Sequence, residues 1–419
     1  LRSLVLVCLV AVCVAKAPLK LADLPDAIPQ TYIAVYNEGE TLAQHTVAQI
    51  LVDHEFNING WRASRVIADG VGLEALLNDP AVSYVEADRE MVMIDEVDED
   101  FDPMHNVMRG FVHVQEKQLR PDVCQTQDSG ERIWGLTRTS ARTLPTDFPN
   151  SEFEWDDETD GFGVDVYIVD TGIRVTHNNF EGRATHGFTS STITEGDQDL
   201  NGHGTHVGGT AAGTEFGVAK GASLWAVKVL NSGGSGTVSG IIEGVQWVTS
   251  HHTSKGHPKS VMNMSLGVSP PNDSLEAAIQ AAIDAGVNTC VSARNNNRDA
   301  CVDSPSRMED ALTCAASTIT DTLPTFTNFG PCVNIIAPGN AVLSSDVPND
   351  DSTSTKSGTS MAAPHVAGVV ARYLSGFDDA SVPAPAAVQA WIEETSTKGV
   401  VTLVPPKDTT PNQLLYMAC

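Results

Sequence analysis

VDVYIVDTG, residues 164–172, is a short apolar run that ends in Asp170 and a glycine. An apolar run of this length, closed by a turn signal, is typical of a buried strand. Similar runs recur further along the chain, at residues 223–230, 260–266, 287–293, 311–316 and 333–336. Segments with helical spacing lie between them, notably at residues 237–251 and 274–285. This alternation predicts an α/β fold with three layers, in which helices cover both faces of a mainly parallel sheet and ligands bind at the carboxyl ends of its strands.

A smaller unit precedes this pattern, at residues 30–93. Residues 32–36 and 81–86 are expected to be strands, residues 42–56 have helical spacing, and residues 73–77 form a second helix that stops at NDP. The unit is therefore predicted to be a small α+β domain. Residues 94–128 follow, and they contain the acidic run DEVDED at residues 95–100. A run of like charges without periodicity is typical of a solvated linker, where proteases cut.

The first residues have the pattern of a secretory signal. Arg2 supplies a positive end, and the apolar run at residues 4–14 is too short to span a bilayer. Residues 1–17 are therefore expected to be a signal peptide, cleaved after Ala15 or Ala17, and the protein is expected to be secreted to the extracellular space.

The composition excludes two classes of partner. The chain has 419 residues, enough for two or three domains, and its 25 basic and 53 acidic residues give a net charge of −28. Binding to nucleic acid needs clustered Lys and Arg, and an anionic membrane surface repels so acidic a chain. We therefore expect no nucleic acid and no membrane among its partners.

Three short motifs carry the chemistry: DTG at residues 170–172, NGHGTHV at 201–207 and GTSMAAPH at 358–365. Each alone has a plain interpretation. Asp170 could be structural, His203 and His206 could bind a metal, and Ser360 could cap a helix. Together they supply what acyl transfer needs, because an imidazole can take the proton of a serine while a carboxylate orients the imidazole.

In this order the motifs resemble those of the subtilisin family of serine proteases, most closely its proteinase K-like branch, over residues 134–416. The resemblance implies a triad of Asp170, His203 and Ser360, with His206 packed beneath. It also implies an oxyanion loop at ARNN (residues 293–296), in which the side chain of Asn295 is one donor and the Ser360 amide is the other. The segments Gly234-Ser235-Gly236 and Ser265-Leu266-Gly267 resemble strands that bind an extended substrate.

The family resemblance assigns a role to each region. It divides the chain into a signal peptide (1–17), an inhibitory propeptide (30–93), an acidic linker with the processing region (94–128) and a peptidase domain (129–419). The implied protein is a secreted monomeric endopeptidase, made as a zymogen, that needs no cofactor for catalysis. Its partners would be polypeptide substrates and its own propeptide, which acts as an inhibitor.

Arg294 departs from the family pattern, which has a glycine directly before the oxyanion asparagine. Three outcomes stay open: Arg294 points into solvent, it reaches into the specificity pocket and favours an acidic or small residue, or it distorts Asn295. The last outcome would make the protein a catalytically silent binding protein with a subtilase fold.

Calcium and disulfides complete the expectations. Many relatives bind structural calcium, for which Asp197, Asp199 and Asn334 are candidate ligands; solvated loop carboxylates are the alternative. Besides Cys8 and Cys13 in the signal, the chain has six cysteines, an even number that favours disulfides. Cys301 and Cys332 match a pair in bacterial relatives. The other four allow three pairings, of which we favour Cys290 with Cys314 and Cys124 with Cys419.

Overall fold

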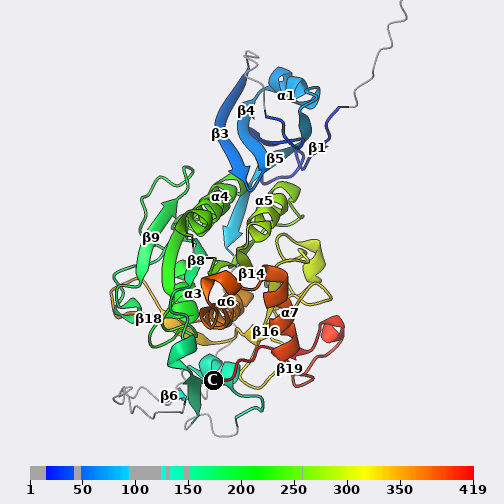
Figure 1. Cartoon of the computed structure of the whole chain (residues 1–419). Coiled ribbons are helices and arrows are strands. Elements are labelled where there is room, and N and C mark those ends of the chain that lie inside the picture. Colours follow the sequence, from blue (N-terminus) through cyan, green and yellow to red (C-terminus); the bar gives the residue numbers. More distant parts are fainter. Residues whose placement is uncertain (1–15, 42–48, 94–123, 129–132, 146–150, 257) are drawn as a thin grey trace, which may run out of the picture. The chain divides into compact units, whose positions relative to one another are not determined.

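The computed structural model describes residues 16–41, 49–93, 124–128, 133–145, 151–256 and 258–419 (Figure 1). Contacts divide the chain into two units, the first ending at Arg89 and the second beginning at Glu90. Most of the predicted signal peptide and of the acidic linker lies outside the described residues. None of the helices in the described ranges has the length and apolarity needed to cross a membrane.

The first unit is a sheet with one helix. Its strand order is β1-β5-β2-β4-β3, and all neighbours are antiparallel except β1 and β5. The strands are β1 (Leu19–Lys20), β2 (Ala27–Tyr36), β3 (Ile50–Ile58), β4 (Trp61–Ala68) and β5 (Val82–Met93). Helix α1 (Gly70–Leu77) begins after Asp69, whose carboxylate accepts hydrogen bonds from two amides of the first turn. Leu76 of this helix packs into the core of the sheet.

The helix predicted over residues 42–56 is wrong in the part that the structure describes, because residues 50–58 form strand β3. A two-residue turn at Asn59 and Gly60 joins β3 to β4 and places Ile58 opposite Trp61. Both turn residues have positive φ, 45° and 93°. An Asn-Gly pair in this conformation is a strong hairpin signal, and cross-strand pairing with β4 overrides the helical spacing.

The second unit contains a sheet with the strand order β19-β20-β16-β15-β14-β12-β8-β10-β9. All neighbours are parallel except β19 and β20, so the predicted α/β fold with a mainly parallel sheet is confirmed. The strands are β8 (Asp165–Asp170), β9 (Ala184–Thr189), β10 (Ser223–Lys228), β12 (Ser260–Met264), β14 (Asn288–Ser292), β15 (Leu312–Ser317), β16 (Ile335–Pro338), β19 (Thr397–Lys398) and β20 (Gln413–Leu414).

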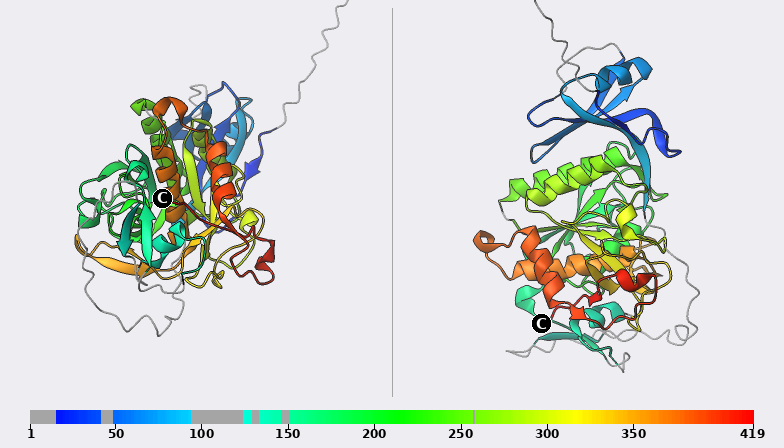
Figure 2. Two further views of the ribbon diagram at one scale, coloured as in Figure 1. Left: turned by 60° about the horizontal axis from the view of Figure 1, so that its bottom comes forward. Right: turned by 90° about the vertical axis from the view of Figure 1, so that its right-hand side faces the viewer.

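Helices cover both faces of this sheet (Figure 2). Helices α4 (Val238–Lys255) and α5 (Asp273–Asp284) pack together on one face. On the other face, α6 (Thr359–Ser375) packs on the central strands and against α3 (His203–Ala212). Alanine, valine and other apolar side chains of α6 are fully buried in the core.

The remaining elements are short. They are helices α2 (Trp134–Ser140) and α7 (Pro385–Thr395), the paired strands β6 (Gln125–Asp128) and β7 (Glu152–Trp155), the paired strands β17 (Val342–Ser345) and β18 (Thr353–Lys356), and the short strands β11 (Ser235–Thr237) and β13 (Leu266–Gly267), which both pair with the end of β5.

Two of the predicted disulfides are confirmed, and one is wrong. Cys124 bonds to Cys419 and Cys301 to Cys332, with Cα atoms 5.8 and 5.4 Å apart. Cys290 and Cys314 are buried free thiols, although their strands are neighbours as expected.

The register of β14 and β15 explains the error. Cys290 lies opposite Leu312, and Cys314 lies opposite Ser292. An offset of two residues is about 6.6 Å along strands about 4.8 Å apart. The Cα atoms are then about 8 Å apart, which exceeds the limit of about 7 Å for a disulfide. Burial raises the pKa of both thiols, which keeps them protonated and inert.

Candidate active site

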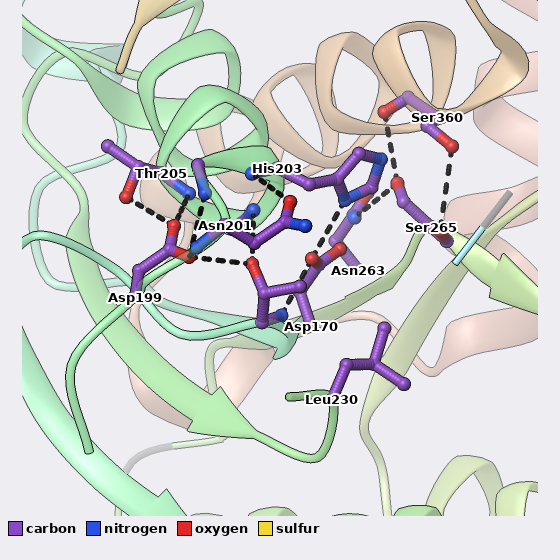
Figure 3. Close-up of polar contacts among 12 residues, drawn as sticks. Asp170, Asp199, Asn201, His203, Thr205, Leu230, Asn263, Ser265 and Ser360 are labelled. Carbon is purple, nitrogen blue, oxygen red and sulfur yellow. Dashed lines mark hydrogen bonds and ion pairs between the residues drawn. The ribbon is translucent and has the colours of Figure 1, made fainter. Parts of the chain in front are cut away.

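Asp170 and His203 form a buried pair at the carboxyl end of the sheet. Asp170 is the last residue of β8, and His203 is the first residue of α3. The Nδ1–H of His203 donates to Oδ1 of Asp170 over 2.8 Å, and both side chains are fully buried. In Figure 3 the imidazole is drawn between the carboxylate of Asp170 and Ser360. A hydrogen bond to Nδ1 sets the orientation of the ring and leaves Nε2 as its other polar edge.

The first turn of α3 approaches the DTG motif closely. A methyl group in place of the Gly204 hydrogen would lie 2.1 Å from the carbonyl oxygen of Gly172. The amide of Gly204 also donates to the hydroxyl of Thr171 over 2.9 Å. Because no side chain fits at position 204, its glycine lets the helix bring His203 within reach of Asp170.

Asp199 holds this turn of the helix in place. Its buried carboxylate accepts five hydrogen bonds of 2.6–3.0 Å, from the Thr171 hydroxyl, the amides of Asn201, Gly202 and Thr205, and the Thr205 hydroxyl (Figure 3). The donors come from both the DTG motif and the helix that carries His203. Asp199 therefore joins the two segments that supply the carboxylate and the imidazole.

Ser360 lies in the first turn of α6, beside the end of β12. Its Oγ donates to the carbonyl oxygen of Ser265 over 3.5 Å. The hydroxyl of Ser265 in turn donates to the carbonyl oxygen of Ser360 over 3.0 Å and accepts from the side-chain amide of Asn263 over 3.0 Å. These contacts join the start of α6 to the segment that resembles a substrate-binding strand (Figure 3).

Asn295 caps the same end of α6. Its Oδ1 accepts hydrogen bonds from the backbone amide of Thr359 over 2.9 Å and from the Thr359 hydroxyl over 3.0 Å. A methyl group on Gly358 would lie 2.9 Å from Nδ2 of Asn295. The side-chain oxygen is thus anchored, and its donor nitrogen lies beside the residues that precede Ser360.

The two segments expected to bind substrate both pair with an extended peptide. Residues Glu90–Met93 of the second unit, at the end of β5, pair antiparallel with β11 and β13. The amide of Met93 also donates to the carbonyl oxygen of Gly234 over 2.7 Å. These strands therefore accept a peptide in the way that a sheet edge accepts an added strand.

Arg294 does not point into solvent. Its side chain is 14% exposed, and its Nη1 lies 3.5 Å from a carboxylate oxygen of Asp303, which is fully buried. The first of the three outcomes considered from the sequence is therefore wrong. Asn295 keeps its cap on Thr359 next to this arginine.

His206 is a buried packing residue, as the resemblance implies. Its Nε2–H donates to the carbonyl oxygens of Val342 and Ser354, over 3.0 and 3.2 Å. Burial lowers the pKa of His206 well below its usual value, and the charges of Lys356 and His203 lower it further. The ring is therefore neutral at pH 7.

The candidate calcium ligands do not form a metal site. In the part of the chain that the structure describes, no group of three or more His, Cys, Asp or Glu residues could hold a metal. Both oxygens of Asp199 are occupied by protein donors, and Oδ1 of Asn334 accepts from the amide of Thr313 over 2.9 Å. Asp197 is exposed and accepts a hydrogen bond from its neighbour Gln198. The three residues thus do not fit a shared calcium ion.

Sequence reasoning missed Thr171, Thr359 and Asp303, and it gave Asp199 the wrong role. Thr171 and Thr359 lie inside the quoted motifs, so their hydroxyls could have been considered as local caps. Asp199 lies three residues before Gly202, the N-cap of α3, so local capping rules do not indicate its role. Nothing in the sequence pairs Asp303 with Arg294.

Comparisons with known proteins agree with this geometry. The model of the subtilase family matches residues 161–413. An extracellular serine proteinase of Thermus sp. is 36% identical, over 96% of this chain and 92% of that protein. A subtilisin-like serine protease of Penicillium rubens is 45% identical, over 68% of this chain and 59% of that protein.

A solved structure has the same fold. The crystal structure of a cold adapted subtilisin-like serine proteinase matches with a TM-score of 0.62 and 38% identity, and the match covers 69% of this chain and all of that one. None of these matches supports a silent binding protein. The chain belongs to the subtilase family of serine proteases.

Proposed function

We propose that this serine protease is a secreted endopeptidase, made as a zymogen, with Asp170, His203 and Ser360 as its triad. The observation that carries the proposal is the buried hydrogen bond of 2.8 Å between Asp170 and His203, beside the helix that begins with the Ser360 motif. Polypeptides are the substrates that the family implies.

The chemistry follows from these positions. Ser360 Oγ attacks the carbonyl carbon of the peptide, and its proton passes to Nε2 of His203. The C–N bond then breaks, and His203 returns the proton to the leaving amine, which leaves an acyl-enzyme for water to hydrolyse. Asp170 holds Nδ1–H and stabilises the imidazolium that forms. Nδ2 of Asn295 and the amide of Ser360 donate to the oxyanion.

The zymogen proposal rests on the peptide that occupies the substrate strands. Glu90–Met93 pairs with β11 and β13 in the second unit, and these are the last four residues of the predicted propeptide, 30–93. A segment bound there competes with substrate. We infer that residues 30–93 inhibit the protease until the chain is cut in the acidic region at 94–128. A signal peptide at residues 1–17 would send the zymogen out of the cell.

A serine-directed fluorophosphonate tests the proposal directly. The purified, processed protein should be labelled at Ser360, as mapped by mass spectrometry, and should hydrolyse denatured casein. Ser360→Ala should remove the label and lower kcat about 10⁶-fold, the size known for loss of triad residues in subtilisin, a member of this family. The same spectra give the N-terminus of the processed chain.

The results of these experiments distinguish an active protease from a catalytically silent protein with the same fold. A folded, processed protein without label or hydrolysis would favour a silent subtilase fold. Label at Ser360 that persists when His203 is replaced by alanine would contradict the role of His203, because an unassisted serine reacts slowly with such probes. Residues 30–93, made separately and added back, should inhibit the processed enzyme. Absence of inhibition would contradict the propeptide assignment.

A further inference from the structure

Arg294 has a backbone conformation that normally belongs to glycine. Its φ is +79°, in the left-handed region that side chains with a Cβ rarely adopt. Hydrogen bonds hold the backbone on both sides: its amide donates to the Thr359 hydroxyl over 3.0 Å, and its carbonyl oxygen accepts from the amide of Asn328 over 2.9 Å. The direction in which the Arg294 side chain leaves the loop is therefore set by these two hydrogen bonds, one of which is to Thr359 at the start of α6.

The side chain runs along Gly267 toward a buried carboxylate. A methyl group in place of the Gly267 hydrogen would lie 3.0 Å from Cδ and 3.2 Å from Cγ of Arg294. The guanidinium lies 3.5 Å from Asp303, which also binds the guanidinium of Arg298 and the side-chain amide of Asn328. The aliphatic part of Arg294 thus packs on the β13 backbone, and its far end is held by an anchored carboxylate.

The pairing of β13 identifies the peptide position that faces Ser360. Val92 lies opposite Gly267 and Met93 opposite Leu266, in antiparallel register. Extending this register by one residue reaches Ser265, whose carbonyl oxygen accepts the hydrogen bond from Ser360 Oγ. In a bound substrate, the residue opposite Ser265 therefore brings its carbonyl carbon to the serine, and it is the residue that precedes the scissile bond.

The side chain of that residue points toward Arg294. Residues directly opposite each other in an antiparallel pair share a face of the sheet, and so do residues two apart on one strand. The Cβ direction at Gly267 leads to Arg294. The substrate side chain opposite Ser265 therefore lies on the face of the sheet to which the Cβ direction of Gly267 points. The aliphatic part of Arg294 already occupies the space on that face.

We propose that Arg294 is a specificity-determining residue, which fills the slot for the side chain that precedes the scissile bond. The protease then cleaves after small residues such as alanine and serine and rejects large apolar and aromatic ones. The inference rests on the proposed function, because it assigns the slot from the position of Ser360.

Quenched fluorescent peptides that differ only at this position test the proposal. The processed protein should have a higher kcat/KM for the alanine and serine peptides than for the leucine and phenylalanine peptides. Arg294→Gly removes the filling group, and its glycine suits the positive φ. It should raise the Phe/Ala ratio of kcat/KM between about tenfold and a hundredfold, the discrimination that burying such a side chain supplies.

Two further variants distinguish the effect of the Arg294 side-chain volume from a general effect of losing one positive charge. Arg294→Lys keeps the aliphatic chain and the cation and should keep the preference for small residues. Arg142→Gln removes one positive charge at an exposed position, where the arginine stacks on Tyr416 at 3.8 Å. It should leave the Phe/Ala ratio unchanged. In Arg294→Gly, Asp303 still binds Arg298 and Asn328, so the folded unit should persist, as thermal unfolding will check.

Several results would overturn the proposal. They are a wild-type preference for phenylalanine, a Phe/Ala ratio that Arg294→Gly leaves unchanged, and a wild-type preference for glutamate over both glutamine and alanine. The last result would mean that the guanidinium is exposed to the substrate and selects charge. Fluorophosphonate labelling distinguishes failure of the proposed function from failure of the role of Arg294. If the protein is not labelled and cleaves no peptide, the proposed function fails. If the protein is labelled but Arg294→Gly leaves the Phe/Ala ratio unaltered, only the role of Arg294 is overturned.

Discussion

Helices α3 and α6 each carry a residue of the proposed triad in their first turn, but their N-terminal ends are capped differently. The first four amides of α3 all have partners: the Asn201 side chain, the Thr171 hydroxyl, the carboxylate of Asp199 and the carbonyl oxygen of Gly202. The cap of α6 comes from the neutral side chain of Asn295. One helix therefore holds a fixed anion at its positive end, and the other has an uncharged cap.

The difference matches the charge that each end meets during the proposed reaction. The positive end of a helix attracts anions. At α3 the carboxylate of Asp199 balances the positive end of the helix. The imidazole of His203, which lies at this end, is the group that becomes positive in the proposed reaction. At α6 a carboxylate cap would oppose the oxyanion that forms next to Ser360. The neutral amide of Asn295 caps the helix without cancelling the positive potential at its N-terminal end, which can then stabilise the oxyanion.

Charging the α6 cap should have the largest effect. Asn295→Ala removes one donor and should lower kcat about 10²–10³-fold, the loss known for the oxyanion asparagine of subtilisin. Asn295→Asp has nearly the same shape but adds a negative charge beside the oxyanion, so it should lower kcat further. Steady-state kinetics with one peptide substrate measure both variants.

Asn296→Asp is the matched control, because this exposed neighbour acquires the same charge one residue along the loop. It should retain nearly full activity. A loss in Asn295→Asp no greater than that in Asn295→Ala would show that the charge of the cap is unimportant, and the comparison between the helices would fail.

Neutralising the α3 cap should have a smaller effect. Asp199→Asn keeps one acceptor oxygen but presents an amide nitrogen to donors that need an acceptor. Leaving buried donors unsatisfied costs about 1–3 kcal/mol each. We expect the free energy of unfolding to fall by about 2 kcal/mol and kcat to fall about tenfold, because the turn that carries His203 loosens.

The exposed Asp197 provides the control for that experiment. Asp197→Asn changes the net charge equally and should alter neither quantity. If added calcium restored Asp199→Asn, or if a chelator reduced the wild-type protein to the stability of the variant, Asp199 would be a metal ligand after all.

The smallest effect on activity concerns a histidine buried in α6. The Nδ1–H of His365 donates to the carbonyl oxygen of Met361, one turn earlier in the helix, over 2.8 Å. Burial lowers the pKa of His365 to about 4. The unfolded chain binds this proton below about pH 6.5 and the folded chain only below about pH 4, so stability falls as the pH drops through this window.

His365→Gln should remove that contribution, which is on the order of 3 kcal/mol over the whole window. Urea unfolding at pH 4 to 7 measures it, in a Ser360→Ala background that prevents self-digestion. The variant should show a shallower decline toward low pH while kcat at pH 7 stays near its original value. An unchanged pH dependence would mean that His365 does not control acid stability. His206 of α3 titrates in the same direction and accounts for a residual decline.

Local sequence identified the residues that the structure brings together at the candidate site, because each residue of the proposed triad lies in a short contiguous motif. The α/β alternation likewise predicted the sheet and its main helices. The failures involve placement across the chain. The helix expected at 42–56 gave way to pairing with β4, and the bond between Cys290 and Cys314 failed on a two-residue offset in register. The position of the Arg294 side chain depends on Gly267 and Asp303, which no motif joins to it.

The disulfide between Cys124 and Cys419 gives the second unit a closed covalent topology. The bond joins residues 295 positions apart and so makes a ring of nearly the whole peptidase region. A single cut anywhere in a ring opens it without releasing a fragment. A protease at high concentration is exposed to cleavage by its own copies, and here the first such cut leaves every strand and helix tethered to the rest. The proposed processing, if it falls at residues 94–123, would lie outside the ring and would free the enzyme without opening it.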